Sequence, residues 1–268
     1  MRVRTVLLLA GLALALGTAA LARQSRDLDE GIVSVALKGK VHARVVLPEG
    51  YASHPTRRYP VVYFLHGLPA GSSSYLGNSW LVKAMDTVRP AILVVPQGAR
   101  DSDTDPEYLN WGAGRNWETY IADEVPRYID AHFRTIRSPK GRALIGVSAG
   151  GYGATIVGLH HPGVFSVIES WSGYFHPTDP TGTKALAREP ATNVHTLVHD
   201  IQSRRTWFAF YVGRGDARFE AENVQLDSEL TEAHVAHVFE LYAGRHETSL
   251  WAAHAHLWLR LALDRLAR

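Results

Sequence analysis

The segment that most constrains the fold is a short apolar run that ends in a Gly-x-Ser-x-Gly motif. Residues 143–147 have the character of a buried strand, and Gly146, Ser148 and Gly150 form the motif, before small residues that can begin a helix. A side chain at either glycine should collide with a neighbouring strand or helix, because the turn must be tight. The pattern predicts a strand–turn–helix unit that holds the Ser148 hydroxyl outward at the start of a helix, and the alternative is a turn without chemistry.

The N-terminus has the three parts of an export signal. Arg2 and Arg4 supply positive charge, residues 6–16 are apolar, and residues 20–22 (Ala-Leu-Ala) form a small-x-small cleavage site. We therefore expect residues 1–22 to be a signal peptide that is cleaved, and the protein to be secreted or otherwise extracytoplasmic. An uncleaved N-terminal membrane anchor is the alternative.

The composition is that of one globular domain and excludes several other classes of protein. Residues 23–268 are enough for a single large domain. The chain has no cysteine, so disulfides and a lipidated cysteine are both excluded, and an exported chain must be stabilised by its core. The net charge of +2 gives no indication of a nucleic-acid partner. Nothing in the sequence indicates the oligomeric state.

Predicted strands and helices alternate along the chain. The predicted strands are residues 32–37, 41–47, 59–65, 91–95, 143–147, 164–171, 206–212 and 235–242. The predicted helices are residues 81–88, 117–132, 152–160, 221–233 and 246–266. Residues 38–40 separate the first two strands as a hairpin turn. The sequence therefore predicts an α/β fold, with a mostly parallel central sheet, an N-terminal antiparallel hairpin and helices on both faces.

Two polar residues follow predicted strands at the edge of the sheet where ligands bind in such folds. Asp216 comes after strand 206–212, and His246 comes after strand 235–242. The chain order Ser148, Asp216, His246 is that of the α/β-hydrolases. In this interpretation a neutral His246 takes the proton of Ser148, while Asp216 fixes the tautomer and stabilises the imidazolium.

Other carboxylates compete for the role of the acid. Glu220 and Glu222 lie on the turn after Asp216. Asp216 also has a common structural alternative, since aspartate often caps the N-terminus of a helix, and the two roles are compatible.

The loop after strand 59–65 is the candidate for the oxyanion site. The backbone N–H groups of Leu68 and Ala149 are the two predicted donors. We interpret His66 as a buried histidine that bonds to loop carbonyls rather than as the catalytic base. No metal and no cofactor are predicted, because the chain has no cysteine and no His-Glu-x-x-His motif.

Two further features lie near the predicted site. The aromatic residues Trp111, Trp117, Tyr120 and Tyr152 could line an acyl or sugar pocket, although core packing is the simpler explanation for each. Residues 173–203 interrupt the alternation of strands and helices. They are predicted to form an insertion that walls the substrate cleft.

These residues resemble an esterase family that groups feruloyl and acetyl xylan esterases, S-formylglutathione hydrolases and envelope mycolyltransferases. The matching segments are residues 63–67 (Tyr-Phe-Leu-His-Gly), 117–120 with 123–126, 161–165, 213–216 with 220–223, and 244–246 followed by Trp251. They span nearly all of the chain after the predicted signal. The resemblance implies an α/β-hydrolase fold with Ser148 as nucleophile, Asp216 as acid and His246 as base. It also implies that Leu68 and Ala149 are the backbone donors.

The chain departs from the family pattern at two places. Arg245 replaces the usual second glycine before His246, so the loop that holds this histidine is expected to differ. His66 and Pro69 stand where the mycolyltransferases carry Asp and Arg, which favours plain ester hydrolysis over transfer of a mycolyl group to trehalose.

The predicted function is that of an exported serine esterase, which hydrolyses carboxylic esters through an acyl-enzyme. The expected substrate is a small-molecule, glycan or lipid ester, and contact with the cell envelope is an open possibility. One alternative is an acyltransferase of the mycolyltransferase type, which moves an acyl chain to a sugar hydroxyl. Others are a non-catalytic envelope-binding protein on the same scaffold and a serine peptidase.

Overall fold

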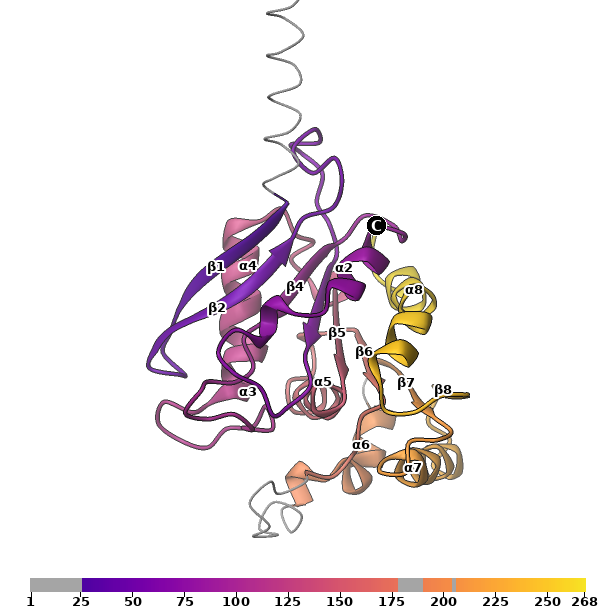
Figure 1. Ribbon diagram of the computed structural model, residues 1–268. Coiled ribbons are helices and arrows are strands. Elements are labelled where there is room, and N and C mark those ends of the chain that lie inside the picture. The colour runs from indigo at the N-terminus through magenta and orange to yellow at the C-terminus, as the bar shows by residue number, and fades with distance from the viewer. Residues whose placement is uncertain (1–25, 178–189, 204–205) are drawn as a thin grey trace, which may run out of the picture.

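The computed structural model describes residues 26–177, 190–203 and 206–268. The predicted signal peptide and cleavage site therefore lie outside the described residues. An eight-stranded sheet runs through the molecule in the order β1-β2-β4-β3-β5-β6-β7-β8 (Figure 1). The strands are β1 (Asp27–Ser34), β2 (Gly39–Val46), β3 (Val61–Leu65), β4 (Ile92–Pro96), β5 (Arg142–Val147), β6 (Val167–Trp171), β7 (Trp207–Gly213) and β8 (His237–Tyr242).

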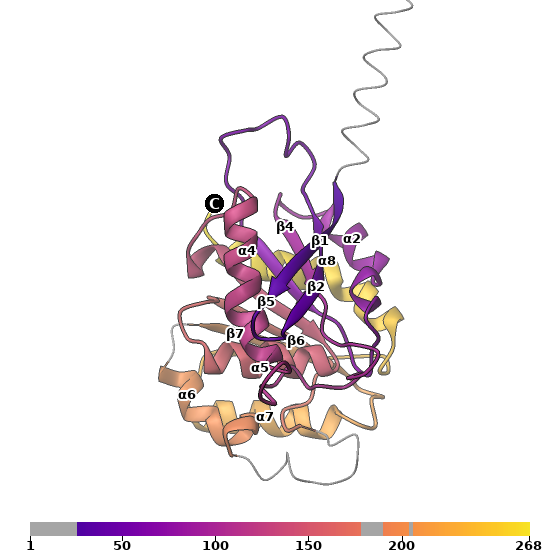
Figure 2. The same ribbon diagram turned by 90° about the vertical axis from the view of Figure 1, so that its left-hand side faces the viewer.

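Helices cover both faces of this sheet, as the two views in Figures 1 and 2 show. The α-helices are α2 (Ser79–Met85), α3 (Trp117–Thr119), α4 (Val125–His132), α5 (Ala149–His160), α6 (Val198–Ser203), α7 (Glu220–Glu232) and α8 (Thr248–Arg265). The 3-10 helices are η1 (Ser74–Leu76), η3 (Pro139–Gly141), η5 (Pro190–Thr192) and η6 (Val194–Leu197), and η2 (Tyr120–Glu124) is a π-helix. The predicted helix 117–132 is thus continuous in sequence but consists of α3, η2 and α4.

Strand pairing agrees with the predicted α/β-hydrolase architecture. β1 pairs with β2 and β2 with β4 in antiparallel fashion, whereas all pairs from β4 to β8 are parallel. The central strands β3 and β4 are buried along their whole length, which explains their continuous apolar character. The predicted fold class is therefore confirmed.

The core consists of two apolar layers, one on each face of the sheet. On one face the buried side chains come from α4, α5 and α7, and include Ile129, Ile156 and Leu226. On the other face they come from α2 and α8, and include Leu81 and Trp258. None of the helices among the described residues is long and apolar enough to cross a membrane.

The prediction for the N-terminal hairpin was right in kind but wrong in position. The first strand was predicted at residues 32–37, but β1 begins at Asp27 and ends at Ser34, and residues 35–38 form the turn. Polar side chains obscured the start of the strand in the sequence. β1 is an edge strand with one exposed face, so Asp27 and Asp29 point away from the core and pair with Arg44 and His42 of β2.

Candidate active site

Ser148 occupies the tight turn between β5 and α5. Its backbone has a φ of 57°, a conformation that a residue with a side chain rarely adopts. A Cβ atom at Gly146 would lie 1.9 Å from the carbonyl oxygen of Gly150, and one at Gly150 would lie 2.1 Å from that of Leu65. The predicted steric reason for both glycines is confirmed, and the turn has the geometry of a nucleophile elbow.

Two hydrogen bonds connect the side chains of Ser148, His246 and Asp216. The Oγ of Ser148 lies 2.9 Å from Nε2 of His246, and Nδ1 of the same ring lies 2.6 Å from Oδ2 of Asp216. Because a carboxylate only accepts hydrogen bonds, the Nδ1–H of His246 donates to Asp216. Nε2 is then free to accept the Ser148 hydroxyl proton. The structure thus brings together the three residues that were predicted from separate strand ends.

The loops that carry Asp216 and His246 are bound to each other through their backbones. The N–H of Arg214 donates to Tyr242 O over 2.7 Å, and the N–H of Gly215 donates to Gly244 O over 2.8 Å. A Cβ atom at Gly213 would lie 2.7 Å from Gly244 O, so the close approach of the loops requires a glycine there. This contact fixes the carboxylate against the imidazole.

The departure at Arg245 leaves this loop able to hold the histidine. Gly244 has a φ of 146°, whereas Arg245 is not among the residues with a positive φ. The position before His246 therefore does not require glycine. The exposed Arg245 side chain extends past the loop of Gly215.

Asp216 is buried and uses both carboxylate oxygens. Oδ2 accepts from His246, and Oδ1 accepts from the backbone N–H of Arg218 over 3.2 Å. The residue does not cap α7, because the N-cap position is Phe219. The N-cap alternative for Asp216 is therefore wrong, and its side chain closes a local turn instead.

Among the described residues, neither of the two rival carboxylates forms a hydrogen bond with His246. Glu220 begins α7, and Glu222 accepts hydrogen bonds from His176 and His195. Burial opposes ionisation of Glu222, but the hydrogen bonds from these histidines outweigh it and lower its pKa to about 2. Glu222 is thus already paired with two other imidazoles.

The loop after β3 lies directly against the nucleophile. A Cβ atom at Gly67 would lie 3.3 Å from Cβ of Ser148, so the backbone passes unusually close to the serine. Within the described residues, neither the N–H of Leu68 nor that of Ala149 donates to a hydrogen bond. Ala149 is the first residue of α5, where an N–H has no acceptor within the helix. Both predicted donors are thus available to a ligand.

His66 has the structural role that was predicted for it. Its buried ring donates from Nδ1 to Gly67 O over 2.9 Å and accepts the Gly98 N–H at Nε2 over 3.1 Å. Burial lowers the pKa of His66, which keeps the ring in the neutral form that these two hydrogen bonds require. The hydroxyl of Tyr108 also donates to His66 O over 2.6 Å. These contacts fix the loop that carries Leu68.

A pocket of about 380 Å³ opens at Ser148, within the usual size of a small-molecule site. It is lined by residues 66–70, Ser74, Gly77, Asn78, Val147, Ser148, Arg218, His246 and Trp251. Trp251 and Phe219 contact the His246 ring edge to face, at 5.2 and 5.1 Å between centroids. No motif in the sequence connects Asn78 or Arg218 with the site, because both lie on loops between the matching segments.

The four aromatic residues proposed for the pocket do not line it. Trp117, Tyr120 and Tyr152 are fully buried in the core, and Trp111 is 38% exposed on the surface outside the pocket lining. Core packing, the simpler explanation, is therefore correct for three of them.

The predicted insertion does not wall this pocket with its described residues. Residues 173–177 and 190–203 contribute nothing to the lining, and residues 178–189 lie outside the described part of the chain. The described residues pack on α5 and α7 instead, as the Tyr152 hydroxyl shows by donating to Thr192 O over 2.8 Å.

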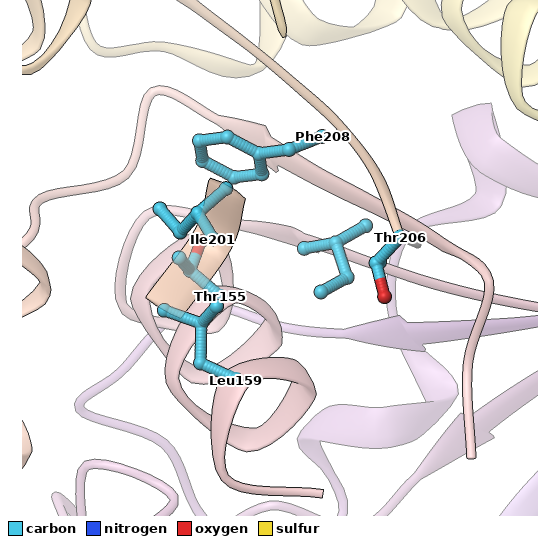
Figure 3. Close-up of a pocket in the computed structure, with 6 residues that line it drawn as sticks. Thr155, Leu159, Ile201, Thr206 and Phe208 are labelled. Atoms are coloured by element: carbon cyan, nitrogen blue, oxygen red, sulfur yellow. The ribbon is translucent and has the colours of Figure 1, made fainter. Parts of the chain in front are cut away.

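A second, apolar pocket lies where α6 packs against α5 and β7. Figure 3 shows Thr155, Leu159, Ile201, Thr206 and Phe208 around it. Its volume of about 10 Å³ is barely enough to hold one water molecule. It is a packing void and not a ligand site.

The mostly parallel sheet and the serine, histidine and aspartate at its edge define the molecule as an α/β-hydrolase. A model of the family described as putative esterase matches residues 34–256, and the chain belongs to this esterase family. The predicted family resemblance is thereby confirmed.

Several curated proteins are similar over part of their length. The chain is 31% identical over 129 residues to an esterase of Mycobacterium tuberculosis, across 48% of this chain and 28% of that protein. It is 31% identical over 132 residues to the MPT51/MPB51 antigen of Mycobacterium bovis, across 47% of this chain and 41% of the antigen. It is 25% identical to the S-formylglutathione hydrolase of Rattus norvegicus, across 57% of this chain and 59% of that enzyme. The chain thus spans less than two thirds of the length of each of these relatives.

Solved structures match over nearly the whole chain. A ferulic acid esterase has a TM-score of 0.75 and 22% identity, covering 90% of this chain and 98% of its own. An S-formylglutathione hydrolase from Agrobacterium tumefaciens has a TM-score of 0.76 and 19% identity, covering 90% and 96%. At these identities the likeness shows the fold.

Proposed function

We propose that the protein is a serine esterase that hydrolyses carboxylic esters. The observation that carries this proposal is the continuous pair of hydrogen bonds from Ser148 through His246 to Asp216 at the mouth of a pocket. Membership of the esterase family supports the same activity. A non-catalytic binding protein would not need this arrangement of three side chains on a strained turn.

The geometry supports the following reaction. His246 accepts the Ser148 proton at Nε2 as Oγ attacks the ester carbonyl, and the negative oxygen that forms accepts the N–H groups of Leu68 and Ala149. His246 then returns the proton to the leaving alcohol, which gives an acyl-enzyme and a free alcohol. Water, deprotonated by the same imidazole, releases the acid and restores Ser148. Asp216 keeps the imidazole oriented and stabilises its charged form.

The pocket gives a substrate preference within this reaction. Arg218 is exposed, lines the pocket, and makes no side-chain hydrogen bond or ion pair with the described residues. Leu68, Val147 and Trp251 supply apolar surface. Esters that combine an apolar part with a negative charge fit such a lining. Transfer of the acyl group to a sugar hydroxyl would use the same intermediate and differ only in the second acceptor.

We further propose that residues 1–22 are a signal peptide, that residues 23–268 form the esterase domain, and that the protein acts outside the cytoplasm. The sequence pattern supports export, and a mycobacterial antigen is among the relatives. N-terminal sequencing of the extracytoplasmic protein should find Arg23. Retention of residues 1–22 on membrane-bound protein would favour the anchor.

The activity is tested with p-nitrophenyl esters of graded chain length, with and without trehalose or other sugar acceptors. The wild type should release p-nitrophenol and react at Ser148 with a fluorophosphonate, which mass spectrometry locates. Ser148→Ala should lose both turnover and labelling while its thermal unfolding is unchanged, because only one oxygen atom is removed. Near-wild-type turnover in this variant would refute the proposal. Sugar-dependent acyl products would establish the transferase alternative.

A further inference from the structure

Two histidines and a glutamate meet on the side of the molecule where the segment after β6 packs on α7. His176 follows β6, His195 lies in η6, and Glu222 lies in α7. Their ligand atoms all lie within 4.8 Å of one another, and no other three His, Cys, Asp or Glu side chains of the described residues meet in this way. None of the three lines the pocket at Ser148. The cluster is therefore a separate feature.

The glutamate of this cluster is fixed in position before any ligand arrives. Glu222 Oε1 accepts the backbone N–H groups of Phe175 and His176 over 2.8 and 3.0 Å. Its side chain is only 12% exposed. No hydrogen bond to its other oxygen, Oε2, is found among the described residues. A rigid carboxylate with an open oxygen is suited to bind a cation.

The orientation of His195 is that of a metal-binding histidine. Its Nδ1 lies 2.6 Å from Oε2 of Glu229, and its Nε2 faces Glu222 Oε1 at 3.3 Å. Nε2 thus faces the same carboxylate oxygen, Oε1 of Glu222, that Nδ1 of His176 approaches at 2.5 Å, so both rings present a nitrogen to one carboxylate. A carboxylate behind a histidine is also the usual support of a metal ligand.

The distances also fit a metal ion. Zinc bonds of about 2.1 Å in tetrahedral geometry place neighbouring ligand atoms about 3.4 Å apart. Nε2 of His195 and Oε1 of Glu222 already have this spacing, at 3.3 Å. The pair of His176 and Glu222 is closer, at 2.5 Å, but the His176 side chain is 43% exposed and can move outward by about 1 Å.

We propose that His176, His195 and Glu222 bind one divalent transition metal ion, and that Glu229 orients His195 for it. Two imidazole nitrogens and one carboxylate oxygen are ligands that Zn²⁺ favours. The solvent-facing side, at His176, leaves a fourth position for water. The ion joins the segment after β6, η6 and α7, and so stabilises the described part of residues 173–203 on the helix that follows Asp216. This inference does not depend on the esterase activity.

The test uses the untagged full chain, stripped with a chelator and then dialysed. Zinc binding is measured by isothermal titration calorimetry at pH 7.5, and the bound zinc is counted by elemental analysis. The wild type should hold one zinc ion per chain, and its Tm should rise by about 5 °C or more at hundredfold excess over Kd. Co²⁺ should give the visible absorption bands of a tetrahedral site.

Variants assign the ion to these side chains. His195→Gln and Glu222→Gln should each weaken zinc binding by a factor of about 100 or more, and Glu229→Gln by about 10 to 100. His176→Ala, at an exposed side chain, should also abolish the Co²⁺ bands and serves if the other variants do not fold. Circular dichroism monitors folding in each variant.

The matched control is another glutamate with two histidine partners. Glu118 Oε1 lies 3.0 Å from His160 Nδ1 and 2.8 Å from His161 Nε2. The ligand atoms of these three residues do not, however, all lie within 4.8 Å of one another. His161→Gln should therefore keep the zinc ion and the Tm rise. The proposal is overturned if the wild type shows no zinc-dependent Tm rise, or if His195→Gln and Glu222→Gln retain wild-type affinity. Equal loss of zinc in His161→Gln overturns it as well.

Discussion

Nδ1 of His246 lies 2.6 Å from Oδ2 of Asp216, although thirty residues separate the two along the chain. The sheet brings them together, because β7 and β8 are parallel neighbours and the loops that follow them share two backbone hydrogen bonds. The pair is thus held by main-chain contacts, which a side-chain substitution leaves in place. This makes the acid testable by a conservative change.

Asp216→Asn should reduce kcat by about ten thousand-fold while the fold stays intact, because the amide no longer fixes the imidazole in the working tautomer. Ester hydrolysis and the Tm are the two measurements. Glu220→Gln, four residues further at the start of α7, is the control and should keep most of the activity. A mild effect of Asp216→Asn combined with a severe effect of Glu220→Gln would show that Glu220, and not Asp216, is the acid.

Gly146→Ala should destabilise the fold by about 3 kcal/mol or more, because the new methyl group would overlap the carbonyl oxygen of Gly150 at 1.9 Å. Urea unfolding of the purified variant, or its failure to accumulate as folded protein, measures the effect. Gly39→Ala is the matched control, since the atoms nearest to a Cβ there lie 4.0 Å away. Equal stability of the two variants would show that the turn is looser than described.

Arg218→Gln should raise KM about tenfold for esters that carry a carboxylate and leave neutral esters nearly unchanged, because a charge-assisted hydrogen bond is lost. Steady-state kinetics with a matched charged and neutral ester pair measures this. Arg214→Gln removes an exposed cation from the same loop, outside the pocket lining. It should leave KM unchanged for both the charged and the neutral ester. An equal effect of both variants would indicate that the overall positive charge attracts the ester, instead of a direct contact with Arg218.

Glu118 should contribute to resistance against acid. Burial opposes its ionisation, but hydrogen bonds from His160 and His161 outweigh this and lower its pKa to about 2. A carboxyl with a lowered folded-state pKa stabilises the fold above its unfolded pKa of about 4.3, and this contribution is lost as the pH falls through about 2. The wild type should therefore lose unfolding free energy across this window.

Urea unfolding between pH 6 and pH 2 compares the wild type with Glu118→Gln. The variant should be less stable at pH 6 and should lose less on acidification, because it has no carboxyl to protonate at this position. Glu49→Gln, at an exposed position, should follow the wild-type curve. Parallel curves for wild type and Glu118→Gln would contradict the role of the histidine pair.

The parts of the site that were predictable lie where local pattern and sheet topology coincide. Ser148, Asp216 and His246 each follow a strand whose apolar run is legible in the sequence, and parallel strands bring such ends to one edge. The start of β1 was not predictable in this way. An edge strand exposes alternate residues, and its acidic side chains look like a polar linker.

Other features depend on tertiary packing that no local pattern reports. Arg218 enters the pocket only through the path of the loop before α7. His176, His195 and Glu222 come from three separate segments of the chain with no metal-binding motif among them, and no metal was therefore expected from the sequence. The family resemblance could indicate the catalytic residues, but it had no bearing on this cluster.

The position of β8 has a consequence for how the protein fails on heating. β8 is one of the two edge strands of the sheet, and all its residues are exposed or half-buried, whereas every residue of β6 is buried. Edge segments open in local fluctuations that cost less free energy than global unfolding. His246 is carried by the loop that follows this strand. Inactivation should therefore precede melting of the core, and the amides of β8 should exchange with solvent deuterium before those of β3 and β5.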